Sequence, residues 1–442
     1  MSFAALFALC VVVRRTRLSL GLPIAYLGLL LLQHLPGAVA HAFADQNIAY
    51  GVLTPTEYAD TGMFLTMIGV VCFFVGVALA QTGRLPPNIR FRALSAKFPR
   101  FCLYGGWLVT FGLVLFPLLP FIDIPSVGAA IDKAGALWIL GALIGLRGAV
   151  TMGRLRQIVL WVAAIMVYPV VVLLAAGFLS YGATAAMIAV SALAVGARTL
   201  TRLFASIMLV AVLGTSLFAN YFVARDSIRA VTWSDAGWEV RIRVVMDAFS
   251  DLEPLALSNP KHVKALDQRL NQNYFVGVAA SRLDGGLVNY KWGWSLVEAA
   301  MSLVPRVIWP DKPVYGGSPA IVREMTGLEL SETTSWGVGN VMEFYINFGI
   351  PGLVLGFVLL GVLLGRLDRN AAISLAKGDH TGAIMCFLPA IALIQPIGSL
   401  VELASGSAAA FVGALAWKYA WHAFDPRRQT DERQLQARGW RE

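Results

Sequence analysis

Long apolar runs dominate the pattern of hydrophobic and polar positions along this chain. A helix needs about 20 such residues to cross the hydrocarbon core of a bilayer. Several runs are rich in Gly and Ala, which favours close packing between helices in lipid. The pattern predicts an all-α, polytopic membrane helix bundle with ten transmembrane helices, or eleven if residues 1–13 also span. The ten expected spans are 20–40, 61–81, 101–122, 134–150, 158–180, 183–198, 203–224, 350–366, 381–399 and 403–422.

Residues 225–349 form the only large polar part of the chain. Apolar residues recur there at helical spacing in "SIRAVTWSDAGWEVRIRVVMDAFSDLEP", "HVKALDQRLNQNYFVGVAASRLD" and "WSLVEAAMSLVP". This segment is therefore expected to form several amphipathic helices over one end of the bundle. The predicted organisation is an N-terminal transmembrane bundle (1–224), a large outer loop (225–349), C-terminal transmembrane helices (350–422) and a tail (423–442).

The distribution of cations predicts the orientation of the spans, because short loops rich in Lys and Arg stay on the cytoplasmic side. If "RRTR" at 14–17 is cytoplasmic, most other cations fall on the same side, whereas the short outer loops carry only Lys133. The segment 225–349 carries 12 cations and 14 acids, although the whole chain has a net charge of +9. The large loop is therefore expected on the outer face and the C-terminus in the cytoplasm.

Composition excludes an ordinary soluble domain. The chain is 57% hydrophobic and 14% charged, with a mean hydropathy of +0.68, against about 25% charged residues in average soluble proteins. Nucleic acid is not an expected partner, because the basic residues are not gathered on a water-facing domain. The four cysteines show no CxxC spacing, so neither a disulfide framework nor a zinc site is predicted.

The stretch "VPRVIWPDKP" at 304–313 places three prolines and two cations in an otherwise apolar region. Proline stops a helix and keeps its neighbours extended, so Arg306 and Lys312 are presented from a stiff strap. A guanidinium suits a bidentate grip on phosphate, and lysine adds a point charge. On the outer face of a bilayer, the anion to expect is a lipid-linked pyrophosphate. The alternative is that both cations reach lipid headgroups.

Half of the 12 tryptophans lie in the segment 225–349. They are either an aromatic belt at the membrane interface or platforms on which sugar rings stack. Trp309 and Trp336 are the best candidates for the second role, since they stand next to charged or small polar residues. The six are Trp233, Trp238, Trp292, Trp294, Trp309 and Trp336.

"PRVIWPDKPVYGG", followed by "TGLELSETTSWGVGNVMEFYINFGIPGLVLGFVLLGVLLGRLDR", resembles the bacterial O-antigen and exopolysaccharide repeat-unit polymerases over about 280–370. The resemblance implies a GT-C-like glycosyltransferase in the bacterial cytoplasmic membrane, with its large loop in the periplasm. It would transfer a growing glycan from a polyprenyl pyrophosphate carrier onto a fresh lipid-linked repeat unit, without cofactor or metal. A chain-length regulator and a flippase are possible partners.

That reaction requires cations that stabilise the departing pyrophosphate and a carboxylate that takes a proton from the acceptor hydroxyl. Arg306 and Arg282 are the catalytic candidates for the first role, helped by Lys312, and Glu343 is the candidate base. Its rivals are Glu298, Asp284 and Asp311, and capping or ion pairing is the structural alternative for each carboxylate. The candidates for binding sugar are Trp309, Tyr315, Ser335, Trp336, Tyr345 and Asn347.

Three other functions remain open: an O-antigen-type glycan ligase, a transporter or flippase for lipid-linked glycan, and an assembly scaffold. A ligase that relies on a loop histidine is less favoured, because His262 is the only histidine in the outer segment and its polar surroundings predict a solvated helix start. A transporter should show ionisable residues within spans and internal repeats. The spans hold few such residues, and Glu402 is expected to be a local hydrogen-bond partner.

Overall fold

The computed structural model describes residues 19–43, 53–81, 106, 136–177, 180–196, 200–234, 236–250, 253–304, 308–313, 318–329, 336–377 and 379–424. Within these ranges every regular element is a helix and no strand occurs. The predicted all-α class is therefore confirmed for this part of the chain. Residues 1–13, the tail 425–442 and the expected span at 101–122, apart from residue 106, lie outside the described residues.

Helices form where the apolar runs predict them. They are α2 (Leu22–Phe43), α4 (Thr56–Gln81), α7 (Leu137–Thr151), α8 (Leu155–Ala176), α9 (Ser180–Gly196), α10 (Leu200–Thr232), α16 (Asn340–Lys377), α17 (His380–Leu393) and α18 (Leu400–Phe424). Four described helices are long and apolar enough to cross a membrane, namely α2, α4, α16 and the stretch Leu400–Tyr419 of α18. This supports a membrane protein, while the full number of spans and their orientation stay predictions.

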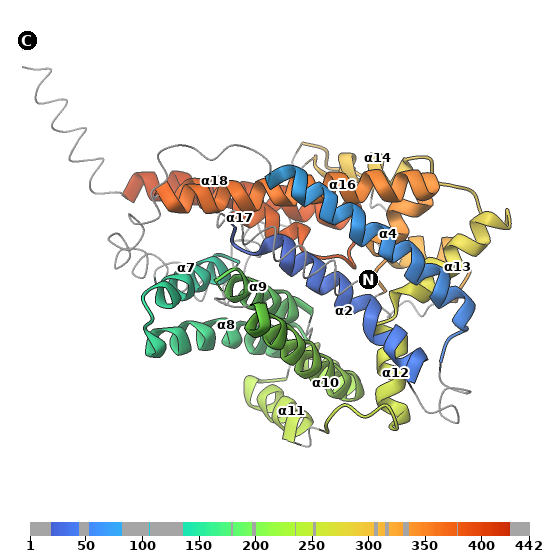
Figure 1. Cartoon of the computed structure of the whole chain (residues 1–442), viewed down its shortest axis with the longest axis horizontal. Coiled ribbons are helices and arrows are strands. Elements are labelled where there is room, and N and C mark those ends of the chain that lie inside the picture. Colours follow the sequence, from blue (N-terminus) through green and yellow to red (C-terminus); the bar gives the residue numbers. More distant parts are fainter. Residues whose placement is uncertain are drawn as a thin grey trace, which may run out of the picture.

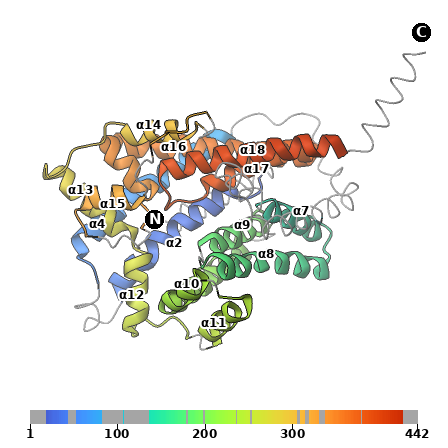
Figure 2. The same cartoon turned by 180° about the vertical axis from the view of Figure 1, so that it is seen from behind.

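The helix α2 lies between two groups of helices (Figure 1). On one side are α4, α16, α17 and α18, and on the other are α7 to α10 (Figures 1 and 2). The outer segment adds α11 (Trp238–Ser250), α12 (Pro260–Arg269), α13 (Gln272–Asp284), α14 (Trp294–Ser302) and α15 (Ser318–Thr326). In Figure 1, α12 and α13 lie toward one end of the bundle, whereas α11 lies beside α10 and α14 beside α18. The position of the segment over an outer end of the bundle stays a prediction.

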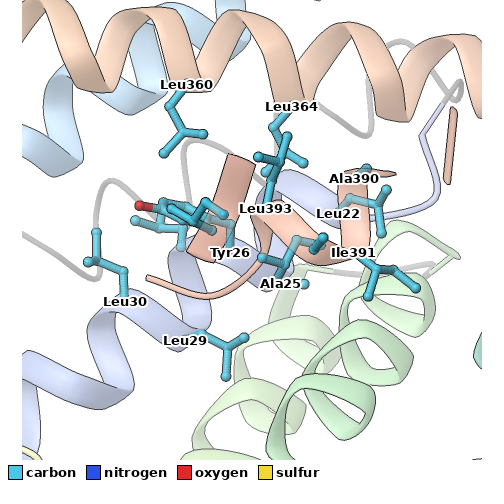
Figure 3. Close-up of a cluster of buried hydrophobic side chains, with 14 of the residues drawn as sticks. Leu22, Ala25, Tyr26, Leu29, Leu30, Leu360, Leu364, Ala390, Ile391 and Leu393 are labelled. Carbon is cyan, nitrogen blue, oxygen red and sulfur yellow. The ribbon is translucent and has the colours of Figure 1, made fainter. Parts of the chain in front are cut away.

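The main core forms where α2 meets α16 and α17 (Figure 3). Leu22, Tyr26 and Leu30 of α2 are fully buried there, against Leu364 of α16 and Leu393 of α17. Burying one such side chain contributes roughly 1.5–3 kcal/mol in water. The Tyr26 hydroxyl, which cannot stay unpaired inside a core, donates to Asn340 Oδ1 at 2.7 Å. The core thereby orients the first turn of α16.

Close backbone contacts bring α4 against both α13 and α16. A β-carbon on Gly62 would collide with the carbonyl of Asn273, and one on Gly277 would collide with the carbonyl of Tyr58. Glycine is required at these positions because any side chain would force the helices apart. The outer helix α13 is thus packed against a candidate span as tightly as the spans pack against each other.

Asp267 attaches the outer segment to the end of α2. Its buried carboxylate accepts hydrogen bonds from the Thr54 amide at 2.7 Å and the Asn271 side chain at 2.7 Å, and it lies 2.8 Å from His41 Nε2. Burial alone would raise the pKa of Asp267, but the bonds from His41, Asn271 and Thr54 outweigh it and lower that pKa. The folded state therefore binds the Asp267 proton more weakly than the unfolded chain does.

We predict that Asp267→Asn lowers the free energy of unfolding at pH 7 by about 2–3 kcal/mol, because bonds to a charged acceptor are lost. The contribution of Asp267 is complete above its unfolded pKa of about 3.9 and disappears as pH falls through the lower folded pKa. In detergent, the melting temperature of the variant should lie well below that of the wild type at pH 7, and this difference in melting temperature should shrink below pH 4. Asp247→Asn, at an exposed position of α11, is the matched control. A difference in melting temperature that does not change with pH would contradict the role of the charged Asp267 carboxylate.

Candidate functional site

Three arginines gather where the end of α10 meets the end of α12. Arg225 and Arg229 are four residues apart on α10 and so share one helix face, and Arg269 is the last residue of α12. The guanidinium carbons of Arg225 and Arg269 each lie 5.5 Å from the centre of the Phe222 ring. Arg229 lies 5.2 Å over the ring of Trp233. We refer to Arg225, Arg229 and Arg269 as the arginine cluster.

Within the arginine cluster, the charges of Arg225 and Arg269 are poorly neutralised by the described residues. Arg225 approaches Asp226 at 3.4 Å, but that carboxylate is 93% exposed and therefore strongly screened by water. The Nε atoms of Arg225 and Arg269 are buried without a hydrogen-bond partner in the described part of the chain. Burial and the neighbouring charges of Arg225 and Arg229 lower the pKa of Arg269 to about 10. An anion bound here would supply the missing acceptors and relieve the repulsion.

Trp336 connects the arginine cluster to the start of α16. The guanidinium carbon of Arg269 lies 4.0 Å from the centre of the Trp336 ring, which is a close cation–π contact. The edge of the same ring system meets Phe275 at a centroid distance of 4.7 Å. Trp336, predicted as a platform for sugar, thus holds a cation on its face and fixes the position of Arg269.

The chain that follows Trp336 is bonded to the break between α17 and α18. Gly339 and Asn340 donate their backbone amides to the carbonyls of Ile397 and Pro396 at 3.0 and 2.9 Å. The Asn340 side chain also donates to the carbonyl of Gly398 at 3.3 Å. Gly339 has a φ of +72°, which most other residues would adopt only with strain. These bonds set where α16 begins.

Glu343, in the first turn of α16, has one anchored and one open carboxylate oxygen. The side chain is fully buried, and Oε2 accepts the Leu400 amide of α18 at 2.7 Å. Oε1 is buried and has no well-formed hydrogen bond within the described residues, although the Ser295 hydroxyl lies beside the carboxylate. The bond to Leu400 is a capping role, and the first turn of a helix favours negative charge. The open oxygen remains available to a hydroxyl proton.

Glu402 also caps the start of α18, so Glu343 is not the only residue that caps this helix end. Its amide donates to Ser399 Oγ at 3.2 Å, and its carboxylate accepts the Ser399 amide at 3.1 Å and the Ser318 hydroxyl at 3.0 Å. This reciprocal pair is a capping box. The prediction that Glu402 is a local hydrogen-bond partner is confirmed.

A second buried acceptor without a donor lies near the same segment. Gln272 Oε1 has no partner among the described residues, and its side chain is 3% exposed. It lies 4.0 Å from where a β-carbon on Gly339 would stand. The surroundings of residues 336–343 therefore offer donors on Arg225 and Arg269, and acceptors on Gln272 and Glu343, that are unfilled among the described residues. Phosphate oxygens accept and sugar hydroxyls donate, so a sugar phosphate would fill both sets.

Asn347 is close to Glu343 but is already engaged within the protein. Its amide donates to the carbonyl of Glu343 at 2.7 Å and to Ser295 Oγ at 2.8 Å. Its oxygen accepts the Gly293 amide at 3.0 Å. In this conformation Asn347 holds α14 against α16, and its role as a sugar partner stays a prediction.

Arg282 and Tyr345 are placed away from the arginine cluster. Arg282 lies near the far end of the 13-residue helix α13, roughly 15 Å along its axis from Gln272. Its guanidinium packs under the backbone of Gly327, at the end of α15. Tyr345 lies beside Tyr290, with a centroid distance of 6.5 Å, and near Asp284. The role of Arg282 in stabilising a pyrophosphate therefore stays a prediction.

The proline-rich strap is described only in part. Lys312 donates to the carbonyls of Ser302 and Val304 at 3.0 and 2.8 Å and so caps the end of α14. Trp309 is 37% exposed, and Asp311 is exposed. The predicted clamp residue Arg306 and the predicted sugar partners Tyr315 and Ser335 lie outside the described residues.

His262 corrects one expectation. It lies in the first turn of α12, as predicted, but its side chain is 2% exposed instead of solvated. The reason is local, because the Ala256 amide donates to His262 Nδ1 at 3.3 Å and Val263 packs beside it in a small apolar cluster. His262 therefore supports the loop before α12.

The arginine cluster was missed by sequence reasoning. The available signal was "RDSIR" at 225–229, in which two arginines stand at helical spacing with Trp233 one turn further on. Comparison of the chain with protein-family models, curated proteins and solved structures finds no match. Function is therefore inferred from the geometry and from the sequence.

We predict that pyrophosphate stabilises the purified protein, because it binds the folded arginine cluster and not the unfolded chain. At a concentration a hundredfold above the dissociation constant the gain is about 2.7 kcal/mol. Thermal unfolding in detergent with pyrophosphate, compared with sodium chloride at equal ionic strength, measures this shift.

Arg269→Gln should abolish the pyrophosphate shift and change the stability of the ligand-free protein little, since the loss of the cation–π contact with Trp336 opposes the gain from removing one of three repelling charges. Arg243→Gln, which removes an exposed guanidinium from α11, is the matched control and should retain the shift. The anion site would be contradicted if pyrophosphate raised the melting temperature of both variants equally. It would also be contradicted if pyrophosphate raised the melting temperature of the wild type no more than chloride does.

Proposed function

We propose that this protein is a membrane glycosyltransferase that polymerises polyprenyl-pyrophosphate-linked oligosaccharide repeat units at the outer face of the bacterial cytoplasmic membrane. The observation that carries the proposal is the arginine cluster, three partly buried guanidinium groups close to one another, in which Arg225 and Arg269 have buried Nε atoms without a hydrogen-bond partner among the described residues. Trp336 contacts Arg269 of this cluster, and Glu343 follows Trp336 by seven residues in the chain. Glu343 is a buried carboxylate with one oxygen that lacks a described hydrogen-bond donor. The product would be O-antigen or exopolysaccharide.

The charge of the arginine cluster suits a diphosphate better than a single phosphate. Three guanidinium groups can each make paired bonds to phosphate oxygens, and a diphosphate has enough oxygens and charge to use them. The cluster also stands at the end of α10, which was predicted from its apolar run to span the membrane. A diphosphate attached to a lipid would reach such a position from the bilayer surface.

In the proposed reaction, a hydroxyl oxygen of the acceptor sugar attacks the anomeric carbon of the donor glycan. The bond between that carbon and the diphosphate oxygen breaks, and the polyprenyl pyrophosphate leaves with the electron pair. The arginine cluster stabilises the charge that develops on the leaving group. The open Oε1 of Glu343 takes the proton of the acceptor hydroxyl. The expected stereochemical outcome is inversion, in a GT-C-like helical enzyme.

Position within the described helices gives Glu343 a specific advantage over its rivals as the base. Glu298 is half-buried on α14, and Asp284 and Asp311 are exposed. Glu343 combines complete burial, one anchored oxygen and one open oxygen. An anchored carboxylate keeps its orientation, which a proton acceptor requires.

We predict that Glu343→Gln lowers the rate of chain growth by about 10²–10⁴-fold, the usual contribution of a general base. The fold should persist, because the Gln oxygen still accepts the Leu400 amide. Glu402→Gln is the matched control, since glutamine also completes a capping box and chain growth should continue. The measurement is the length distribution of lipid-linked glycan in cells, with the amount of each variant in the membrane checked in parallel.

Accumulation of single repeat units with Glu343→Gln and long chains with Glu402→Gln would support the polymerase. Long chains in both would exclude Glu343 as the base. Full-length chains that stay on the carrier would favour the ligase, which requires the same pyrophosphate clamp. Repeat units retained on the cytoplasmic face would favour the flippase.

A further inference from the structure

The helix α14 buries small side chains and exposes large apolar ones, which is the reverse of a helix on the surface of a soluble protein. Its inward positions, Ser295 and Ala299, are small and buried at 1% and 8% exposure. Its outward positions are large and apolar, and Trp294, Leu296 and Val297 are 53%, 46% and 44% exposed. Between residues 292 and 304 the sequence contains a single charged side chain, Glu298. A helix with this distribution would be costly to solvate.

Both ends of α14 contact helices that are candidate membrane spans, α16 at its start and α18 at its end. At its start, Gly293 and Ser295 bond to Asn347, just before the apolar run of α16 begins. At its end, the Ser302 hydroxyl approaches the carbonyl of Val401 in the first turn of α18 at 3.5 Å. The helix α14 therefore lies beside α16 and beside the start of α18 (Figure 1).

The exposed face of α14 is continuous with the exposed apolar side of α16. Trp292 is 72% exposed, and its ring meets Phe348 of α16 edge-on at a centroid distance of 6.3 Å. From Phe348 the row continues along the candidate span through Ile350, Leu355 and Leu359, which are 48–61% exposed. Tryptophan is enriched where a bilayer meets water, because one part of the indole is apolar and its N–H is polar.

We infer that α14 is an interfacial helix, with Trp292, Trp294, Leu296 and Val297 inserted among the lipids of the leaflet at this end of the bundle. The partner is the lipid surface itself, in the manner of helices that lie in the boundary between headgroups and acyl chains. This inference does not depend on the proposed function. Its consequence for the site is that α14, through Ser295 and Asn347, separates Glu343 from the lipids by a single helix.

A spin label on Leu296→Cys tests the inference directly. The label is placed in full-length protein whose four natural cysteines are replaced by serine, reconstituted in vesicles of phosphatidylethanolamine and phosphatidylglycerol. Collision with oxygen reports exposure to lipid, and collision with a water-soluble nickel chelate reports exposure to water. Leu355→Cys on α16 and Lys261→Cys on α12 are the lipid and water references. We expect Leu296→Cys to resemble Leu355→Cys, with oxygen collision several-fold above that of the chelate.

Two outcomes would overturn the inference. Collision with the nickel chelate at the level of Lys261→Cys would place α14 in water. Low collision with both reagents would mean that protein covers the face, whether a second copy of this chain or another subunit. If Leu296→Cys lowers the yield of folded protein, Val297→Cys and Ala300→Cys report from the same exposed face.

Discussion

The bond pattern between residues 339–340 and 396–398 is the constraint on which the arrangement around Glu343 depends. Here the backbone amides at the start of α16 use the carbonyls left free by the break between α17 and α18. Those carbonyls would otherwise be unsatisfied inside an apolar bundle, where an unpaired polar group is costly. By filling them, the segment 336–343 places Trp336 against Arg269 and Glu343 against Leu400. Loss of this docking would therefore separate the arginine cluster from the carboxylate.

The arginine cluster, Gln272 and Glu343 include buried polar atoms that lack hydrogen-bond partners among the described residues. Most buried polar groups in folded proteins are hydrogen-bonded, and exceptions call for a physical reason. Here the donors of Arg225 and Arg269 and the acceptors of Gln272 and Glu343 remain without described partners. When a ligand supplies partners for these groups, the hydrogen bonds that form contribute to the free energy of binding. Such local cost is typical of binding sites, where stability is exchanged for affinity.

The sequence predicted the helices well, because an apolar run of the right length can satisfy its backbone in few other ways. It also directed attention to Glu343, since "EFYINFG" stands directly before an apolar run that α16 enters after non-helical angles at Phe348 and Gly349. The arginine cluster could not be predicted in the same way. Its parts come from 222–233, 269 and 336, and their meeting depends on how α10, α12 and the start of α16 pack. Lys312 shows the converse, since a cation that a local pattern assigns to substrate caps the end of α14.

The most direct test of the account uses purified protein in vesicles with one defined lipid-linked repeat unit, isolated from the organism that makes the protein. The measurement is the mass spectrum of all lipid-linked glycans and of free polyprenyl pyrophosphate as the reaction proceeds. The account predicts a ladder of products that differ by one repeat unit, with one polyprenyl pyrophosphate released for every unit added. An unchanged spectrum, or movement of intact substrate between leaflets without release of the carrier, would contradict it.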